Sequence, residues 1–590
     1  MNPAAAFPEG RAAAPLQQSA NGRWGMNWFG GCAPGGRSLV PAGVRFIWDD
    51  PPLWTVGAGS RRFVRTLADS GGRLAVFGPC SATEGDLARA LASPDLAAVF
   101  GGGWAGAHTI VRAGSDGVLE VVSDAAGGSP VYMARVPGGV VWGSSSRALA
   151  GLAGGRVDTD WLAAYLCDVQ GEMRGHSAWA GVDLVPAGHQ LIMHSGEVAR
   201  VSPWWTRKRR PYGEAVASLR DALVEGVRAR AAGAPVSSDV AGLDSSTLAV
   251  LAALEGPVMG MTVHPAGAAE GGDVAYARAL AQELSAMRHV LFPLDERHLP
   301  LSEAEAELPA TDEPAPSSIT WARCSAQLRA ISQAGAACHL TGDGGDTLFQ
   351  PPPTHLSELA RAGQWGRLVA DAQAWALLRR VSPWGLVRAA VRRNTFALVG
   401  GGGQRPAWVT AAAPDRRTLP AVESTSNSAL LAEVRYVARS AHTEQQLADS
   451  LGVELHNPYL DGRVVDAVMS APPRERCSVS RYKPLLADAV GPLLPQAVRH
   501  RRTKGVFVGE FHRGMRMNLR RVLDLAEGRL AGLGLVTPGP LRAAVHAAAL
   551  GAETAWPALL PTLNAEMWLA AIDRAPVAGW HERRRGSSGR

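Results

Sequence analysis

Three stretches of the sequence place carboxylates, hydroxyls or an amine beside glycine-rich turns, a combination that suits phosphate binding. The first is Val236–Ser246 (VSSDVAGLDSS), a strand-like run that opens a helix predicted over Thr247–Glu255. Backbone N–H groups in such a turn, and at a helix N-terminus, point toward an anion. Asp244 among these donors makes sense if it holds Mg²⁺. The alternative is an ordinary helix start capped by Asp and Ser. No GKS or GKT follows the glycine, so this is not a Walker A loop.

The second stretch, His339–Phe349 (HLTGDGGDTLF), also follows a strand-like run, Ala337–Leu340. Asp343 and Asp346 stand three positions apart in its Gly-rich turn. Open α/β sheets bind ligands in the loops at the carboxyl ends of their strands. One carboxylate from each loop, that of Asp244 and that of Asp346, is therefore predicted to bind a shared magnesium ion. A ligand-free Asp/Gly turn is the structural alternative.

The third stretch, His500–Phe507 (HRRTKGVF), contains Lys504. It is one of only three lysines among 59 basic residues, the others being Lys208 and Lys483. A lysine stands out in a chain that otherwise uses arginine, because a compact ammonium differs from a planar guanidinium. Such a point charge suits a pyrophosphate or an oxyanion. A solvated basic surface is the alternative.

Two kinds of scaffold are predicted to position these stretches. From Met26 to about Trp205, short apolar runs between Gly, Pro, Asp and Ser turns predict an α+β domain built on antiparallel sheet. After a basic linker, an amphipathic pattern predicts a helix over Tyr212–Ala231. Strand-like runs then alternate with helices, which predicts a parallel α/β sheet: Val236–Val240, Val258–Val263, Val290–Phe292 and Ala337–Leu340. Residues 1–25 and 581–590 are predicted to be tails.

Composition narrows the class of protein. Hydrophobic residues make up 46% and charged residues 19% of the 590 residues, a globular balance. The formal charge of +6 indicates a mild attraction to anions, but no long basic run or nucleic-acid motif is present, so no nucleic-acid partner is expected. The six cysteines show no zinc spacing. Neither a signal peptide nor an apolar run long enough for a membrane span is found, so a cytoplasmic protein is expected.

In this order, the three stretches resemble the asparagine synthetase family of ATP-pyrophosphatases. The family loop SGGLDSS is similar to Val240–Ser246, although Val240 and Ala241 replace its serine and first glycine. Further segments resemble the family's second loop, its PFLD segment and its lysine-glycine segment: Gly342–Phe349, Asn457–Asp461 and Arg502–Phe507. The N-terminal half resembles the family's glutaminase half at Asp124, Gly127–Tyr132, Gly143–Leu149, Val185–His189 and Trp204.

The resemblance covers roughly residues 26–510 and implies a fold for each half. An N-terminal glutaminase-like domain with Ntn-type antiparallel sheet is expected over residues 26–205. An α/β ATP-pyrophosphatase (adenine nucleotide alpha hydrolase-like) synthetase domain with many helices is expected over residues 206–580.

One departure from the family decides the subgroup. A family glutaminase begins Met-Cys-Gly, with the cysteine as N-terminal nucleophile, whereas this chain reads Met26-Asn27-Trp28-Phe29-Gly30. Asparagine cannot form the thioester, so the glutaminase half is expected to be inactive and the amine to belong to the substrate. We therefore favour an intramolecular amide former, most similar to lasso peptide cyclases. β-Lactam synthetase, glutamine-hydrolysing asparagine synthase and, in another class, a non-catalytic scaffold are the alternatives.

As a lasso cyclase, the enzyme would adenylate an Asp or Glu side chain of a precursor peptide and join it to the peptide's N-terminal amine. The resemblance implies ATP and Mg²⁺ as cofactors, and a leader-binding protein and leader peptidase as partners. It implies an ATP and pyrophosphate site formed by Val240, Ala241, Gly242, Leu243, Asp244, Ser245, Ser246, Val263 and Gly342. It implies peptide contacts at Glu313, Gly344 and His456, metal ligands at Asp244 and Asp346, and catalytic roles for Lys504 and Asp343.

One further region is unusual in composition. Residues 363–397 carry three tryptophans, Trp365, Trp375 and Trp384, among six arginines. Aromatic side chains with arginines suit a peptide groove or a partner protein. An amphipathic helix pair with a solvated basic face is an equally good interpretation.

Overall fold

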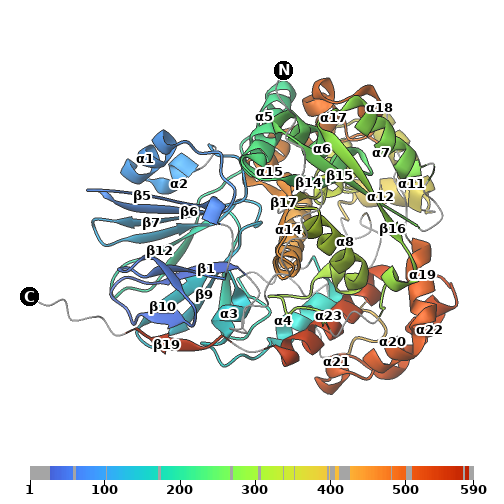
Figure 1. Cartoon of the computed structure of the whole chain (residues 1–590). Helices are drawn as coiled ribbons and strands as arrows, with labels where there is room; N and C mark the ends of the chain where they lie inside the picture. The colour runs from blue at the N-terminus through green and yellow to red at the C-terminus, as the bar shows by residue number, and fades with distance from the viewer. Residues whose placement is uncertain are drawn as a thin grey trace, which may run out of the picture.

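The computed structural model describes residues 27–583 except 58–60, 101–102, 171–174, 266–269, 271, 303–306, 337, 351, 380, 395–397, 399–404, 411–425, 480, 500–507 and 576–577. Figure 1 shows two layers of antiparallel sheet on one side of the molecule and a helix-rich part on the other. No helix in the described ranges is long and apolar enough to cross a membrane.

Two six-stranded antiparallel sheets form the N-terminal part. Their strand orders are β11-β9-β10-β1-β4-β3 and β13-β12-β8-β7-β6-β5. The inner faces of the two sheets enclose large apolar side chains, among them Phe77 and the fully buried Trp142. The strands are β1 (Trp28–Cys32), β3 (Arg45–Trp48), β4 (Leu53–Val56), β5 (Val64–Asp69), β6 (Gly72–Phe77), β7 (Thr109–Gly114), β8 (Leu119–Val122), β9 (Val131–Val136), β10 (Gly139–Gly143), β11 (Val182–Val185), β12 (His189–Met193) and β13 (Arg200–Pro203).

Four helices accompany these sheets. Helix α1 (Glu84–Ala92) begins at a capping box: the Thr83 side chain accepts from the backbone N–H of Asp86, and the Asp86 side chain accepts from the backbone N–H of Thr83. It packs on β5 and β6. The others are α2 (Leu96–Phe100), α3 (Ser146–Ala150) and α4 (Thr159–Cys167). The α+β architecture predicted for this half therefore matches the sheets and helices described.

A five-stranded parallel sheet of order β16-β15-β14-β17-β18 forms the centre of the second half. Its three inner strands are mostly buried, because helices pack against the sheet. The strands are β14 (Val236–Asp239), β15 (Val258–Pro265), β16 (Met287–Leu294), β17 (Cys338–Leu340) and β18 (Glu454–His456). Since β14 lies between β15 and β17, the loops that follow β14 and β17 meet at one edge of the sheet.

Helices surround this sheet and continue to the end of the chain. Those nearest the sheet are α5 (Tyr212–Ala231), α6 (Leu243–Glu255), α7 (Gly272–Glu283), α8 (Trp321–Gln333), α9 (Gly345–Phe349), α14 (Ser426–Asp449), α15 (Gly462–Ser470), α17 (Pro484–Val490) and α18 (Gln496–Arg499). The remaining helices are α10 (His355–Arg361), α11 (Trp365–Arg379), α12 (Pro383–Val391), α16 (Pro473–Arg476), α19 (Val508–Met517), α20 (Leu519–Leu525), α21 (Arg529–Gly532), α22 (Pro538–Ala549) and α23 (Trp556–Arg574).

The two halves are joined by buried polar contacts. Asp312 is fully buried and accepts hydrogen bonds from Ser145 Oγ (2.7 Å), the backbone N–H of Arg147 (2.9 Å) and Gln446 Nε2 (2.8 Å). Ser145 and Arg147 belong to the N-terminal half, while Gln446 lies on α14. This one carboxylate therefore ties α3 to the helix that runs beside the parallel sheet.

The C-terminus departs from the predicted tail. Trp580–Glu582 form strand β19, which pairs antiparallel with β2 (Leu39–Pro41) in the N-terminal half. The predicted tail boundary at residue 581 is therefore wrong for His581 and Glu582. The short polar sequence gave no strand signal of its own, and the partner strand supplies the missing hydrogen bonds. Residues 1–26, the predicted N-terminal tail, lie outside the described residues.

Candidate active site

The first predicted loop connects β14 to α6. Helix α6 begins at Leu243 rather than after Ser246, so Asp244 and Ser245 lie in its first turn. No side chain caps this helix at Gly242. The first N–H groups of a helix lack partners within the helix and carry positive potential. An anion is thus the natural partner for the start of α6, as the sequence predicts.

The second predicted loop packs directly against the first. A Cβ added to Gly342 would lie 2.8 Å from the backbone N of Ser245, and one added to Gly345 would lie 2.5 Å from Cγ of Asp244. Gly344, between them, has a φ of +91°, a backbone conformation that favours glycine. These glycines therefore allow the Asp244 and Asp346 loops to approach each other closely.

A lysine that sequence reasoning did not select lies between the two carboxylates. Lys483 Nζ donates a hydrogen bond to Asp346 Oδ1 at 2.7 Å and another to Asp244 Oδ2. Its side chain is fully buried, whereas that of Asp346 is 40% exposed. Burial alone lowers the pKa of Lys483, but the two carboxylates outweigh it and raise the pKa above its usual value. Lys483 is therefore charged, and it holds the two predicted metal ligands in one place.

The backbone at Lys483 is also unusual. Its φ of 43° puts a non-glycine residue in the left-handed region immediately before α17. Such strain persists only where surrounding contacts fix it, and it is concentrated at functional sites. The rarity of lysine in this chain was the available signal, but the sequence interpretation attached it to Lys504. Lys504 lies outside the described residues.

Asp244 and Asp346 also fit a divalent cation. Their carboxylates converge on the same small ammonium ion, so they are close enough to supply oxygen ligands to one Mg²⁺. The start of α6, the partly exposed Asp346 and the buried Lys483 together form a site of mixed charge that suits a metal–phosphate group.

A cavity of about 470 Å³ opens beside the second loop. Asp343, which is exposed, and Gly344 line it, together with Ser317, Trp321 and Glu444 from the surrounding helices and turns. The Ser317 backbone N–H donates to Glu444 Oε1 at 2.7 Å. Burial raises the pKa of Glu444 to about 7; the hydrogen bonds from Ser317 oppose this rise, and the charge of Asp343 adds to it. Three carboxyl groups thus line the cavity, those of Asp239, Asp343 and Glu444, and burial brings the pKa of Glu444 close to neutral pH.

Several residues that were predicted to bind ATP are placed less favourably for contact with it. Val240 is fully buried, and its N–H donates to the Met261 carbonyl at 2.8 Å. Ser246 is also fully buried, and its N–H donates to the Gly242 carbonyl at 3.1 Å. The sheet and the helix therefore use the backbone N–H groups at these two positions. Ala241 and Gly242 are partly exposed, and Val263 lies near the carboxyl end of β15, next to Thr262, whose hydroxyl bonds the Val240 carbonyl.

The predicted peptide contacts Glu313 and His456 do not line the cavity. Glu313 is buried, with its carboxylate 3.6 Å from Nε of Arg439. His456 is buried against Phe63, with ring centroids 5.2 Å apart, and burial lowers its pKa to about 4. Of the three predicted peptide contacts, only Gly344 lines the cavity.

The predicted glutaminase position is occupied by a structural contact. Asn27 hydrogen-bonds Asp449 at the end of α14 through both its backbone and its side chain. The nearby Cys32 is buried, its Sγ contacts the Leu39 carbonyl at 3.2 Å, and burial raises its pKa to about 12. Neither residue provides a nucleophile.

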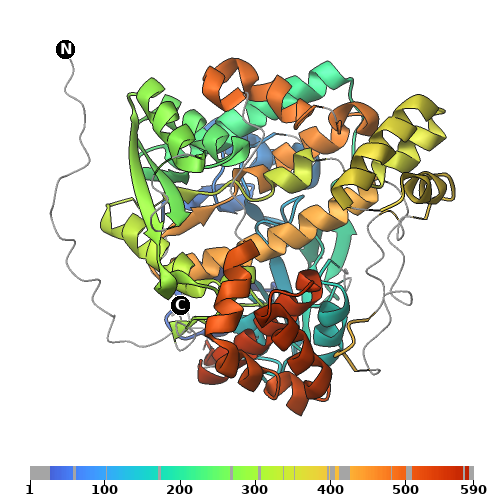
Figure 2. The same cartoon turned by 90° about the vertical axis from the view of Figure 1, so that its right-hand side faces the viewer.

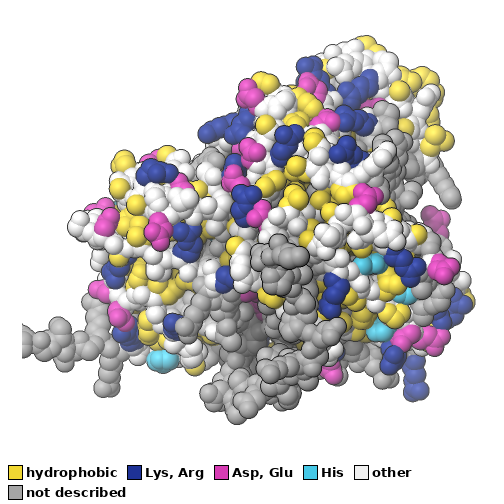
Figure 3. Space-filling view, turned by 45° about the horizontal axis from the view of Figure 1, so that its top comes forward, with side chains coloured by type: hydrophobic (Ala, Val, Ile, Leu, Met, Phe, Trp, Pro, Cys, Tyr) yellow, Lys and Arg dark blue, Asp and Glu magenta, His cyan; other side chains and the backbone are white. Residues whose placement is uncertain are grey.

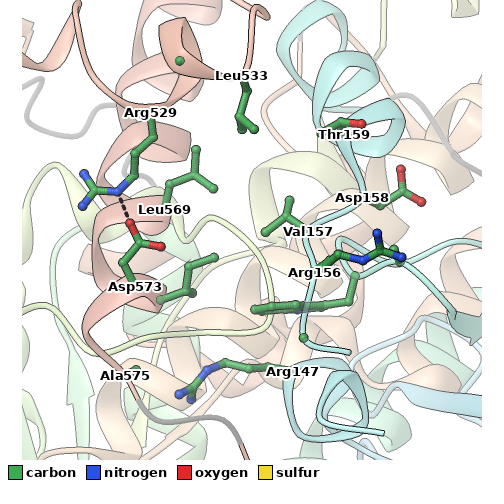
Figure 4. A pocket seen from close by; sticks show the side chains of 15 residues that line it. Arg147, Arg156, Val157, Asp158, Thr159, Arg529, Leu533, Leu569, Asp573 and Ala575 are labelled. Carbon is green, nitrogen blue, oxygen red and sulfur yellow. Dashed lines mark hydrogen bonds and ion pairs between the residues drawn. The ribbon is translucent and has the colours of Figure 1, made fainter. Parts of the chain in front are cut away.

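A larger cavity, of about 800 Å³, lies elsewhere, between the N-terminal half and helices α21 and α23 (Figure 4). Arg147, Arg156 and Arg529 line it. Arg529 forms an ion pair with Asp573, which lines the same side of the cavity. None of the predicted site residues lines this cavity. This cavity is therefore separate from the predicted ATP site.

Comparisons with known proteins identify the family of the second half of the chain. A family model described as asparagine synthase matches residues 218–570, which include both loops and Lys483. No curated protein matches the chain. A glutamine phosphoribosylpyrophosphate amidotransferase from B. subtilis, solved with ADP and GMP, is 13% identical with a TM-score of 0.21, over 56% of this chain and 77% of that chain. A structure described as the allosteric regulatory enzyme of purine biosynthesis is 14% identical with a TM-score of 0.21, over 56% and 76%.

Proposed function

This chain belongs to the asparagine synthase family and is an ATP-dependent amide-forming ligase, and from that premise we propose that it closes a macrolactam in a ribosomal peptide. In this proposal it joins an Asp or Glu side chain of the peptide to the peptide's own N-terminal amine, as lasso peptide cyclases do. ATP is converted to AMP and pyrophosphate.

The observation that carries this proposal is Asn27. Asn27, which hydrogen-bonds Asp449, stands by resemblance where the family's glutaminase has its nucleophilic cysteine, so the proposal takes no ammonia from glutamine. The amine must then arrive with the substrate. The cavity beside Asp343, at about 470 Å³, falls in the range of roughly 300–1,000 Å³ typical of sites for drug-sized ligands. It supports a substrate larger than a single amino acid.

The reaction has two steps. A carboxylate oxygen of the peptide attacks the α-phosphorus of ATP, the bond between the α-phosphorus and the bridging oxygen breaks, and pyrophosphate leaves. The peptide amine then attacks the acyl carbon of the adenylate, the bond from that carbon to the AMP oxygen breaks, and the amide forms. The amine loses one proton in the second step, and a nearby base must accept it.

The residues of the site divide these tasks. The N–H groups at the start of α6 would bind the phosphates of ATP, and Asp244 and Asp346 would hold Mg²⁺, which would neutralise phosphate charge. Lys483, whose side chain is fully buried, keeps the two carboxylates together. Asp343, in the cavity, accepts the proton of the amine, and Glu444 lines the same cavity.

The test measures AMP release and peptide mass together. Purified enzyme, Mg²⁺ and ATP are incubated with leader-free core peptides that carry an Asp or Glu at candidate ring positions. Loss of one water from the peptide, in equal amount to AMP, supports the proposal. AMP release with glutamine and aspartate, or with a small β-amino acid, would instead indicate an asparagine synthase or a β-lactam synthetase. Absence of Mg-ATP binding by calorimetry would indicate a scaffold.

A further inference from the structure

Helices α11 and α12 expose large apolar side chains on the surface. In Figure 2 they lie within the yellow helices that project at the upper right of the molecule. Of the twelve large hydrophobic side chains that are exposed among the described residues, five fall between residues 365 and 391: Trp365 (55% exposed), Leu377 (83%), Val381 (48%), Trp384 (65%) and Val391 (51%). Single exposed apolar residues are ordinary, but such a concentration marks an interaction site.

Helix α12 is apolar on two faces. Leu386, Ala389 and Ala390 face inward and pack with α10 and α11 in a small core of their own. Trp384, Arg388 and Val391 are exposed and follow one another at spacings of four and three residues, so they share the outer face. A helix that is apolar all round is normally buried. Something outside the described fold is therefore expected to cover the outer face.

The charge of this region indicates what covers it. Residues 372–414 contain no Asp, Glu, Lys or His but six arginines, so this segment alone carries +6, equal to the formal net charge of the whole chain. Among these arginines, Arg388, Arg392 and Arg393 are exposed. Figure 3 shows basic and hydrophobic side chains side by side over the upper part of the face it displays. Arginine and tryptophan are also the residues most enriched in the energetic centres of protein interfaces.

We propose that the outer face of α12 is a docking surface for a second protein that presents Asp or Glu around large apolar side chains. The surface consists of Trp384, Arg388, Val391 and Arg392, with Leu377 and Val381 beside it. Nucleic acid would match the arginines but would leave the aliphatic side chains Leu377, Val381 and Val391 without apolar partners. The proposal goes beyond the ligase activity and does not depend on which amide is formed.

Helix α11, on the inner side of this surface, connects it to the ligase site. Arg367, near the start of α11, donates hydrogen bonds to the backbone carbonyls of Arg474 (2.7 Å) and Cys477 (2.9 Å). The chain then runs from Cys477 to Lys483, the lysine of the site. The outer face of α12 contributes no residue to the cavity beside Asp343. Changes on this face should therefore alter partner binding without removing a group from the ligase site.

The test uses fluorescein-labelled synthetic helical peptides as probes and measures anisotropy with the full-length chain. One probe has a Leu stripe flanked by Glu, a second has the same stripe flanked by Lys, and a third has Glu without the stripe. We expect only the first to bind tightly. Trp384→Ser and the double variant Arg388→Glu/Arg392→Glu should each weaken its binding by about tenfold or more. Val198→Ser, at an equally exposed apolar residue, and Arg200→Glu, at an exposed arginine of β13, should change it less than about twofold.

Circular dichroism melts establish that each variant is folded. No binding of the acidic apolar probe, equal binding of the Lys probe, or equal loss in the control variants would overturn the proposal. Tighter binding of a short DNA duplex or of anionic phospholipid vesicles, lost in the same α12 variants, would also overturn it in favour of those partners.

Discussion

Lys483 donates a hydrogen bond to Asp346 at 2.7 Å across 137 residues of sequence, and the same ammonium also bonds Asp244. The two aspartates come from loops that follow β14 and β17. Lys483 comes from a third segment, in a left-handed backbone conformation just before α17. The site is thus a cluster in which one buried cation positions two carboxylates. The predictions below test this cluster and the cavity next to it.

Lys483→Ala should lower AMP formation by at least about 100-fold, because it removes the buried cation that holds the Asp244 and Asp346 carboxylates together. Lys483→Arg should not restore activity, since a planar guanidinium does not fit a pocket shaped for an ammonium between two carboxylates. Lys208→Ala, at an exposed lysine in the linker, serves as the control and should behave as wild type. Steady-state AMP release measures all three. Wild-type turnover in Lys483→Ala would rule out a role for this lysine.

Removal of Mg²⁺ with EDTA should stop AMP formation. Asp346→Asn should shift the Mg²⁺ dependence of AMP formation to concentrations at least about tenfold higher, because one anionic ligand is lost. Asp343→Asn, three positions away in the same loop, should leave the Mg²⁺ dependence unchanged. AMP release as a function of Mg²⁺ concentration gives both results. Identical titrations for Asp346→Asn and wild type would contradict the assignment of Asp346 as a metal ligand.

Asp343→Asn should separate the two steps of the reaction. The adenylation step, followed by ATP–pyrophosphate exchange with the peptide, should remain within a few-fold of wild type. Amide formation should fall by roughly 100-fold or more, because the amine loses its proton acceptor. Asp221→Asn, at an exposed aspartate of α5, is the matched control. Equal losses in both steps would place Asp343 in ATP binding instead of proton transfer.

Gly345→Ala should reduce ATP turnover strongly, since its Cβ would lie 2.5 Å from Cγ of Asp244. The methyl group would push the Asp244 carboxylate out of its place beside Lys483. Gly366→Ala, also in a helix but with no atom within 4 Å of the added Cβ, should be as active as wild type and at least as stable, because alanine favours helix more than glycine. Similar activities of the two variants would show that the close approach of the loops is not needed.

Glu444 should make the protein less stable as pH rises. Its pKa in the folded state is about 7, against 4.5 as the usual value. The folded state then binds more protons than the unfolded state between these values. The stabilisation from the protonated group is fully present below pH 4.5 and is lost as pH rises through about 7. Asp124 and Asp449, also raised to about 7, act in the same direction.

Glu444→Gln should therefore reduce this decline, because its amide does not ionise and can still accept the Ser317 N–H. The midpoints of urea unfolding at pH 5 and pH 7.5 measure the difference. Between these two pH values, the free energy of unfolding should fall more in the wild type than in the variant, by about 1 kcal/mol or more. Glu553→Gln, at an exposed glutamate, should retain the wild-type drop. Parallel behaviour of Glu444→Gln and wild type would mean that Glu444 does not titrate in this range.

The sequence by itself determined the local elements and the two loops. The helix predicted over Tyr212–Ala231 has these bounds in the structure, and the run at Val258–Val263 lies within strand β15. Hydrophobic periodicity is a local property, so neighbouring residues are enough to reveal it. The same is true of Asp244 and Asp346, because the glycine-rich turns around them are contiguous in sequence.

Only the tertiary structure decided which distant groups join these loops. Lys483 is separated from Asp244 by 239 residues and from Asp346 by 137, and nothing in its own segment distinguishes it from Lys504. Glu444 looks like any polar residue of a long helix until α14 is packed beside the cavity and burial raises its pKa. The burial of Val240, Ser246 and His456 likewise depends on packing between elements. Such packing produces no periodic pattern in the sequence.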